Sequence, residues 1–188
     1  ELWYHANGID VSKISDFKKE TKEKSISNSQ VLYKDYYNND VTLIIKEVLN
    51  LLLKRLRKEN LLTKHVSLHI SYSRNIGGYF SVSKKLEQET NDESELYKVL
   101  LSIFNSYYEE DMPVRKVGIS LSKLENNNHI QLNLFDNIKE IDNKTNLNNI
   151  VDEINEKYGN NSILKATSLL STSTIKDRNN KIGGHNAR

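Results

Sequence analysis

Two amphipathic segments, each flanked by segments that alternate apolar and polar residues, constrain the fold of this chain most. In residues 38–60 the apolar side chains keep one broad helical face for about four turns. These side chains are Leu43, Ile44, Val48, Leu51, Leu52 and Leu56. Asp40 is the candidate N-cap of this helix. A second apolar stripe predicts a helix within residues 91–111, with Asp92 or Ser94 as its cap.

The segments around these helices are predicted to be strands. Residues 65–73 alternate between apolar and polar side chains, as a half-buried strand does. Residues 75–78, with two glycines, predict a turn into a second strand over residues 78–86. Further strand patterns occupy residues 27–36 and 113–125.

The resulting order is β-α-β-β-α-β. The economical arrangement is an α+β fold, a four-stranded mixed β-sheet with two helices on one face, plus a flexible C-terminal tail. The uncovered sheet face would carry Ser, Thr, Tyr, Lys and Arg side chains, and it would be free to meet a polar partner.

The chain divides into five parts by composition. Residues 1–10 are compact and mixed, residues 11–24 form a lysine-rich linker, and residues 25–125 form the folded domain. Residues 126–146 are an Asn-rich linker, and residues 147–188 are a tail with a predicted helix over 147–158 and a predicted strand over 162–170. Twelve asparagines within residues 126–161 bury little surface, which favours flexibility there.

Composition excludes several classes of site. The chain has 188 residues and no cysteine, which excludes disulfides and zinc–thiolate centres. No apolar run approaches the roughly 20 residues of a membrane span, and no signal peptide is present, so we expect a soluble, cytoplasmic protein without a membrane partner. The chain begins at Glu1 and its one methionine is Met112, which predicts a piece of a longer protein.

No catalytic constellation stands out. The carboxylates are scattered, and the sequence has no P-loop or nucleophile elbow. His65 and His69 would share a strand face about 13 Å apart, too far for one metal. We therefore expect this chain not to be catalytic by itself, and to need no cofactor.

Basic residues in and beside the predicted strands are more informative. They oppose an acidic second helix, so the domain is polarised although the net charge is only +2. Lysines among small hydroxyl and amide groups suit contacts with nucleic-acid phosphates. An ordinary solvated sheet face has the same composition, so the residues alone leave both readings open.

Three segments, in order, resemble the C-terminal region of Y-family translesion DNA polymerases, in the UmuC-like bacterial branch. ELWYHANGID (1–10) resembles the end of the thumb domain, and KSISNSQVLYKDY (24–36) resembles the opening strand of the little-finger domain. MPVRKVGISLSKLE (112–125) resembles the closing strand of that domain. The segments INEKYGNNSILKATSLL and GGHNA are similar to the tail of the same branch.

The resemblance implies a region that binds DNA without catalysing polymerisation, because no counterpart of the palm carboxylates occurs here. A parent polymerase would use Mg²⁺, in DNA repair, damage tolerance and the SOS response. The implied contacts with primer–template DNA are Lys24, Ser25, Ser27, Ser29, Arg115 and Lys116, with Arg74, Lys84 and Lys85 in a less similar hairpin. Ser27 stands where family members often have Gly, which bears on how closely the backbone there approaches a phosphate.

One short segment resembles a ligand of another protein. Gln131, Leu132, Leu134 and Phe135 match the pattern with which bacterial polymerases hold the β sliding clamp. A fifth strand is the alternative, since residues 129–135 also alternate. The competing function is a non-catalytic interaction module that docks on the clamp or another repair protein. The tail could then serve a RecA-type filament or a UmuD-like subunit.

Overall fold

The computed structural model describes residues 2–10, 24–127, 138–182 and 185–186. A short helix, α1 (Leu2–Ala6), precedes residues 11–23, which lie outside the described residues. The remaining elements are β1 (Ser25–Tyr36), α2 (Asn38–Lys58), β2 (Leu61–Tyr72), β3 (Tyr79–Thr90), α3 (Glu93–Tyr107), β4 (Val114–Asn126), α4 (Ile138–Tyr158), a 3₁₀ turn (Ala166–Leu169), α5 (Ile175–Asn179), β5 (Lys181–Ile182) and β6 (His185–Asn186).

The predicted four-stranded sheet with α2 and α3 on one face is confirmed, but the expectation of a mixed sheet is wrong. The strand order is β1-β4-β2-β3, and all three pairings are antiparallel. Each helix connects two strands that run in the same direction, yet a third strand separates them. Because β4 lies between β1 and β2, and β2 lies between β3 and β4, parallel strands never become neighbours.

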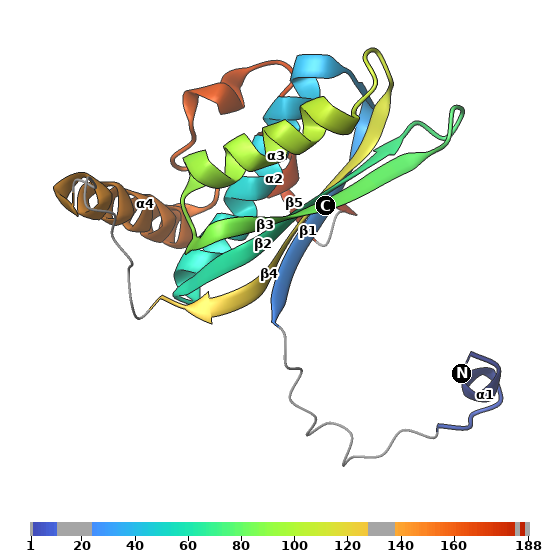
Figure 1. The fold of residues 1–188 in the computed structure, drawn as a ribbon, viewed down its shortest axis with the longest axis horizontal. Coiled ribbons are helices and arrows are strands. Elements are labelled where there is room, and N and C mark those ends of the chain that lie inside the picture. The colour runs from blue at the N-terminus through green and yellow to red at the C-terminus, as the bar shows by residue number, and fades with distance from the viewer. Residues whose placement is uncertain (1, 11–23, 128–137, 183–184, 187–188) are drawn as a thin grey trace.

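The hydrophobic core lies between the sheet and the two helices (Figure 1). α2 contributes a wider buried face than its sequence stripe suggested, including Ile45, Leu49 and Leu53, whereas Leu43 and Leu51 are only half-buried. The sheet contributes the apolar set of its alternating strands, such as Val66, Leu68 and Ile70 of β2. A strand with one buried set presents its other set on the opposite face.

The ends of the helices depart in part from the expectation. Asp92 caps α3 as predicted, since its carboxylate accepts hydrogen bonds from the Ser94 and Glu95 amides at 2.7 and 3.0 Å. Asp40 does not cap α2, because the helix begins earlier, at Asn38. The amide of Asn38 instead donates to the hydroxyl of Tyr108 at 3.1 Å. A tyrosine distant in sequence therefore satisfies one of the free amides at this helix end.

The predicted turn between β2 and β3 is confirmed. The amide of Gly77 donates to the carbonyl of Ser73 at 2.8 Å, and the amide of Tyr72 donates to the carbonyl of Gly78 at 3.1 Å. Gly77 and Gly78 have φ angles of 74° and 89°. Glycine adopts this left-handed region without a steric cost, so the turn follows from the sequence.

The C-terminal segment differs from the flexible tail that composition suggested. The predicted helix over 147–158 is present as part of the longer α4. The predicted strand over 162–170 is wrong, since a 3₁₀ turn occupies part of it. Beyond α4 the chain returns to α2 and β1, and Thr174 is only 2% exposed. Contacts with the folded domain therefore hold a segment that has few apolar residues of its own. No helix in the described ranges combines the length and apolar character that crossing a bilayer requires.

Candidate nucleic-acid interface

The sheet face opposite the helices, named the open face, consists of four rows of paired residues across the four strands. The rows are Ser25, Ser122, His65 and Lys85; Ser27, Ser120, Ser67 and Ser83; Ser29, Gly118, His69 and Ser81; and Val31, Lys116, Ser71 and Tyr79. Between these positions lie the core residues of the strands, such as Ile26, Leu68 and Ile119, on the face that the helices cover. Strand periodicity thus places these sixteen residues on one surface.

Small hydroxyl side chains make up more than half of the open face. Nine of its sixteen positions are serine, and none is Asp or Glu, so no carboxylate of this set opposes an anion. Lys85 and Lys116 supply positive charge in the first and the last of the four rows. Short side chains also allow a large partner to come close to the strands. Such a surface can donate many hydrogen bonds to an anionic polymer without a deep cleft.

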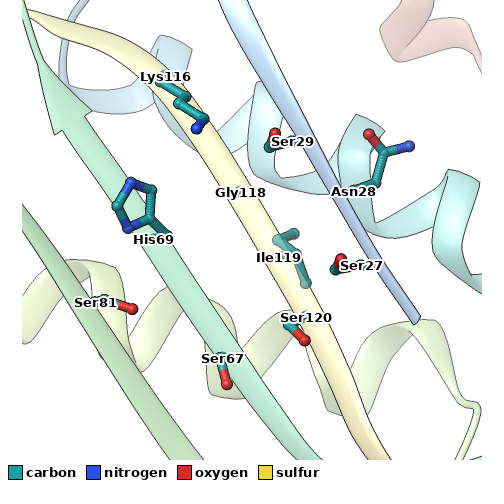
Figure 2. A pocket seen from close by; sticks show the side chains of 10 residues that line it. All are labelled: Ser27, Asn28, Ser29, Ser67, His69, Ser81, Lys116, Gly118, Ile119 and Ser120. Atoms are coloured by element: carbon teal, nitrogen blue, oxygen red, sulfur yellow. The ribbon is translucent and has the colours of Figure 1, made fainter. Parts of the chain in front are cut away.

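A shallow pocket lies at the centre of the open face, lined by residues of all four strands. Figure 2 shows its lining around Gly118 of β4, with His69 on one side and Ser29 on the other. A Cβ added at Gly118 would lie 3.3 Å from the Ser29 Cβ and 3.5 Å from the His69 Cβ. Because Gly118 has no side chain, the middle of the row stays open.

His69 contributes an imidazole ring to the lining of the pocket. Its Nε2 lies 2.9 Å from the Ser71 Oγ, and its ring centroid lies 5.6 Å from that of Tyr79. Partial burial, and to a lesser extent the positive charge of Lys116, lower the pKa of His69 below its ordinary value of 6.5. The imidazole is therefore neutral at neutral pH, and the positive charge beside the pocket belongs to Lys116.

The structure brings together five of the residues that the family resemblance implied. Ser25, Ser27, Ser29, Lys85 and Lys116 all lie on the open face. Lys24 lies immediately before β1 and is exposed.

The other three implied residues lie elsewhere. Arg74 is in the β2–β3 turn, and Arg115 pairs with Asp35, with 3.2 Å between Nη1 and Oδ1. Lys84 points to the helix side, where its Nζ donates to the Ser102 Oγ of α3 at 2.8 Å. One step along a strand reverses the face, so neighbouring Lys84 and Lys85 serve different surfaces.

Several residues of the open face were not predicted as site residues from sequence. They are Ser67, His69, Gly118, Ser120 and Ser122. The alternation in residues 65–73 already separated Ser67 and His69 from the core positions, so this pattern could have identified them as open-face residues. What the sequence lacked was the pairing of β4 with both β1 and β2, which puts Ser67 and His69 in the same rows as Ser27 and Ser29.

The implied clamp-binding residues Gln131, Leu132, Leu134 and Phe135 lie outside the described residues. Within the described ranges, no three His, Cys, Asp or Glu side chains gather in a way that could hold a metal ion. These ranges therefore do not provide the carboxylate set that a polymerase metal centre needs.

Residues 23–134 match the family described as the impB/mucB/samB family C-terminal domain. This match covers more than half of the chain, including β1 to β4 and both covering helices. The chain belongs to the impB/mucB/samB family. The match and the relatives confirm the predicted resemblance to the C-terminal region of a Y-family DNA polymerase.

Relatives of this impB/mucB/samB chain include two from Bacillus and a related genus. The chain is 33% identical over 189 residues to UvrX of Bacillus subtilis (strain 168), a protein named for UV-damage repair. It is 31% identical over 186 residues to DNA polymerase IV 2 of Halalkalibacterium halodurans. Each comparison covers 98% of this chain but 44% of the relative, so the chain spans less than half of their length.

Among solved structures, the impB/mucB/samB domain is similar to a chain in a complex of the beta-clamp processivity factor and the little finger domain of PolIV. The TM-score is 0.45 with 16% identity, over 60% of this chain and 99% of the other. A Dbh ternary complex matches with a TM-score of 0.42 and 18% identity, over 52% of this chain and 28% of the other.

Proposed function

We propose that the open face binds the backbone phosphates of primer–template DNA, as the non-catalytic grip of a translesion DNA polymerase in DNA repair. The composition of the face carries this proposal: nine serines and two lysines, with no carboxylate among its sixteen positions. Serine hydroxyls and lysine ammonium groups are common donors to phosphate oxygens.

The same composition predicts binding that tolerates any base sequence. Bidentate readout of bases uses side chains such as Arg, Asn and Gln, and these are absent from the sixteen positions of the open face. Phosphate contacts give affinity and register without reporting sequence. A polymerase that copies damaged templates needs this property, since it cannot require normal base shape.

The charge distribution supports binding of DNA to the open face and not to the helix-covered face. Lys85 and Lys116 lie on the open face, while acidic residues cluster at the start of α3, where Asp92, Glu93 and Glu95 are found. α3 covers the other face of the sheet. A long anion is therefore attracted to the open face and repelled from the start of α3, although the net charge is only +2.

Two adjacent lysines offer a matched test, because Lys85 lies on the open face and Lys84 contacts Ser102 on the helix side. The affinity of the 188-residue chain for primer–template DNA would be measured by fluorescence anisotropy over a range of salt concentrations. Lys85→Ala should weaken binding and lower the slope of log K against log salt by about 0.9. Lys84→Ala should leave both quantities at their wild-type values.

The proposal fails if Lys85→Ala and Lys116→Ala both bind DNA as the unchanged protein does. It also fails if the affinity does not change between low and moderate salt. Circular dichroism of each variant would establish that the fold is retained, so that a loss of binding reports on the contact.

In this proposal, a region of the parent polymerase other than this chain catalyses nucleotide transfer. The described ranges bring together no metal-binding group, and the chain spans 44% of the length of its DNA polymerase IV 2 relative. We place the Mg²⁺-binding carboxylates of the parent polymerase in the part of such relatives that this chain does not cover. The chain then holds DNA while the metal centre acts on it.

A second candidate function is binding to the bacterial β sliding clamp. The supporting observation is the segment with Gln131, Leu132, Leu134 and Phe135, only five residues beyond the end of β4 at Asn126. Leu and Phe are anchors for apolar pockets, and Gln can bind at the pocket rim. If the chain bound the clamp tightly and did not bind DNA, its function would be that of a docking module and not that of a DNA-binding domain. A RecA-type filament or a UmuD-like subunit as a partner of residues 147–188 stays a prediction.

A further inference from the structure

His69 occupies the centre of the open face in a setting suited to one anion. His69 pairs across the sheet with Gly118 on one side and Ser81 on the other. Ser29, Ser81 and Lys116 line the same pocket (Figure 2). A tetrahedral anion in this pocket would meet the hydroxyls of Ser29 and Ser81 and the ammonium group of Lys116.

Among the described residues, the imidazole has one hydrogen-bond partner, and its second nitrogen has none. Nε2 lies 2.9 Å from the Ser71 Oγ. A neutral imidazole has one N–H donor, so it can donate to an anion only when the Ser71 hydroxyl donates to its other nitrogen. A protonated imidazolium has two N–H donors and can satisfy both. The proton comes from the buffer acid or from hydronium and adds to the ring nitrogen that lacks one, which leaves the conjugate base in solution.

The groups that face His69 decide its charge before DNA arrives. Lys116 from β4 and Tyr79 from β3 are the titratable neighbours, while β1 contributes Ser29 and β2 contributes Ser71. No carboxylate stands among the open-face positions that could offset the positive charge of Lys116. Burial and Lys116 therefore both favour the neutral ring, and they hold the pKa of His69 below its ordinary value.

We propose that His69 takes up a proton when a backbone phosphate of DNA occupies the pocket over Gly118, so that DNA binding is linked to pH. This inference rests on the proposed DNA-binding function of the open face. A phosphate between Lys116 and His69 adds a negative charge that cancels the effect of Lys116 on the ring. It also accepts the second N–H, which stabilises the charged form further.

The sign of the pH dependence follows from proton linkage. The DNA complex holds the His69 proton more tightly than the free protein does, so affinity rises as pH falls. The rise begins at the pKa of His69 in the complex and ends at the lower pKa of the free protein, which lies below 6.5. One group changes the affinity by at most about tenfold per pH unit.

Proton uptake can be measured directly with the 188-residue chain. Isothermal titration calorimetry with primer–template DNA, in two buffers of different ionisation enthalpy at one pH and salt concentration, gives the number of protons bound. We expect a fraction of one proton for the unchanged protein and none for His69→Gln. Affinities from about pH 5.5 to 8.5 at constant salt should lose their rise toward low pH in the same variant.

His65→Gln is the matched control, because His65 lies on the same face three rows from Lys116 and does not line the pocket. Its proton uptake should equal that of the unchanged protein. The inference is overturned if His69→Gln still takes up the proton, or if His65→Gln abolishes the uptake. In either case, weaker DNA binding by Lys85→Ala would still support the DNA-binding face. If Lys85→Ala keeps its affinity and His69→Gln keeps its proton uptake, the proposed DNA-binding function fails as well.

Discussion

Glu47 of α2 accepts hydrogen bonds from both the amide and the hydroxyl of Thr174, at 3.2 and 2.8 Å, across 127 positions of sequence. The hydroxyl of Ser173 donates to the other oxygen of the same carboxylate at 2.5 Å. Thr174 also accepts a hydrogen bond from the side-chain amide of Gln30 in β1 at 2.8 Å. This polar cluster joins the C-terminal segment to the first strand and the first long helix of the domain.

Glu47→Ala should lower the free energy of unfolding by about 2–4 kcal/mol. Glu47 is only 4% exposed, so its removal leaves two buried donors of Thr174 and the partly buried hydroxyl of Ser173 without their acceptor. It also removes the negative charge that partly offsets the burial of Arg178, whose pKa burial lowers. Urea unfolding followed by circular dichroism measures the change.

The control is Glu153→Ala, which removes an exposed carboxylate from α4. Surface substitutions of this kind change the free energy of unfolding by no more than about 0.5 kcal/mol. Equal stability of the two variants would show that the cluster around Glu47 does not hold the C-terminal segment.

Asp152→Ala should detach α4 from α2 more than Glu156→Ala does. Asp152 accepts a hydrogen bond from Arg57 at 2.7 Å, and both side chains are mostly covered, at 23% and 18% exposed. Glu156 pairs with Lys58 at the same distance, but these side chains are 61% and 68% exposed. Solvent screens an exposed pair, so it contributes little.

We expect Asp152→Ala to lower the free energy of unfolding by about 1 kcal/mol, and Glu156→Ala to leave it unchanged within error. Hydrogen exchange of the α4 amides measures the local effect, because detachment of α4 should speed their exchange only in Asp152→Ala. Faster exchange in both variants, or in neither, would contradict this ranking of the two pairs.

A double substitution, Leu134→Ala with Phe135→Ala, should abolish binding to the β sliding clamp and leave affinity for DNA unchanged. The two side chains supply the apolar anchors of the proposed peptide, and neither is among the sixteen residues of the open face. Surface plasmon resonance with immobilised clamp measures the first effect, and anisotropy with primer–template DNA measures the second. Unchanged clamp affinity would refute the assignment of residues 131–135.

Local patterns predicted most of the elements correctly. The apolar stripes of α2 and α3, the Asp92 cap and the glycine turn before Tyr79 depend on neighbours within a few residues, so the sequence contains the information. The β-α-β-β-α-β order was equally local, because each element carries its own periodicity.

Predictions that depended on partners distant in sequence were less successful. The mixed sheet was wrong because nothing local states which strand lies between β1 and β2. Asp40 failed as a cap because Tyr108, seventy positions after Asn38, binds the amide at the helix start. The C-terminal segment was expected to be flexible because its composition is polar, yet its polar side chains meet a buried glutamate on α2.

The sequence by itself determined which side chains share a strand face, because backbone geometry alternates side chains whatever the surroundings are. It therefore contained the serines of the open face and the separation of Lys84 from Lys85. Only the tertiary structure decided which strands became neighbours, because pairing depends on how the helices pack across the whole sheet. That decision placed Gly118 between Ser29 and His69 and made the pocket where we propose that a phosphate binds.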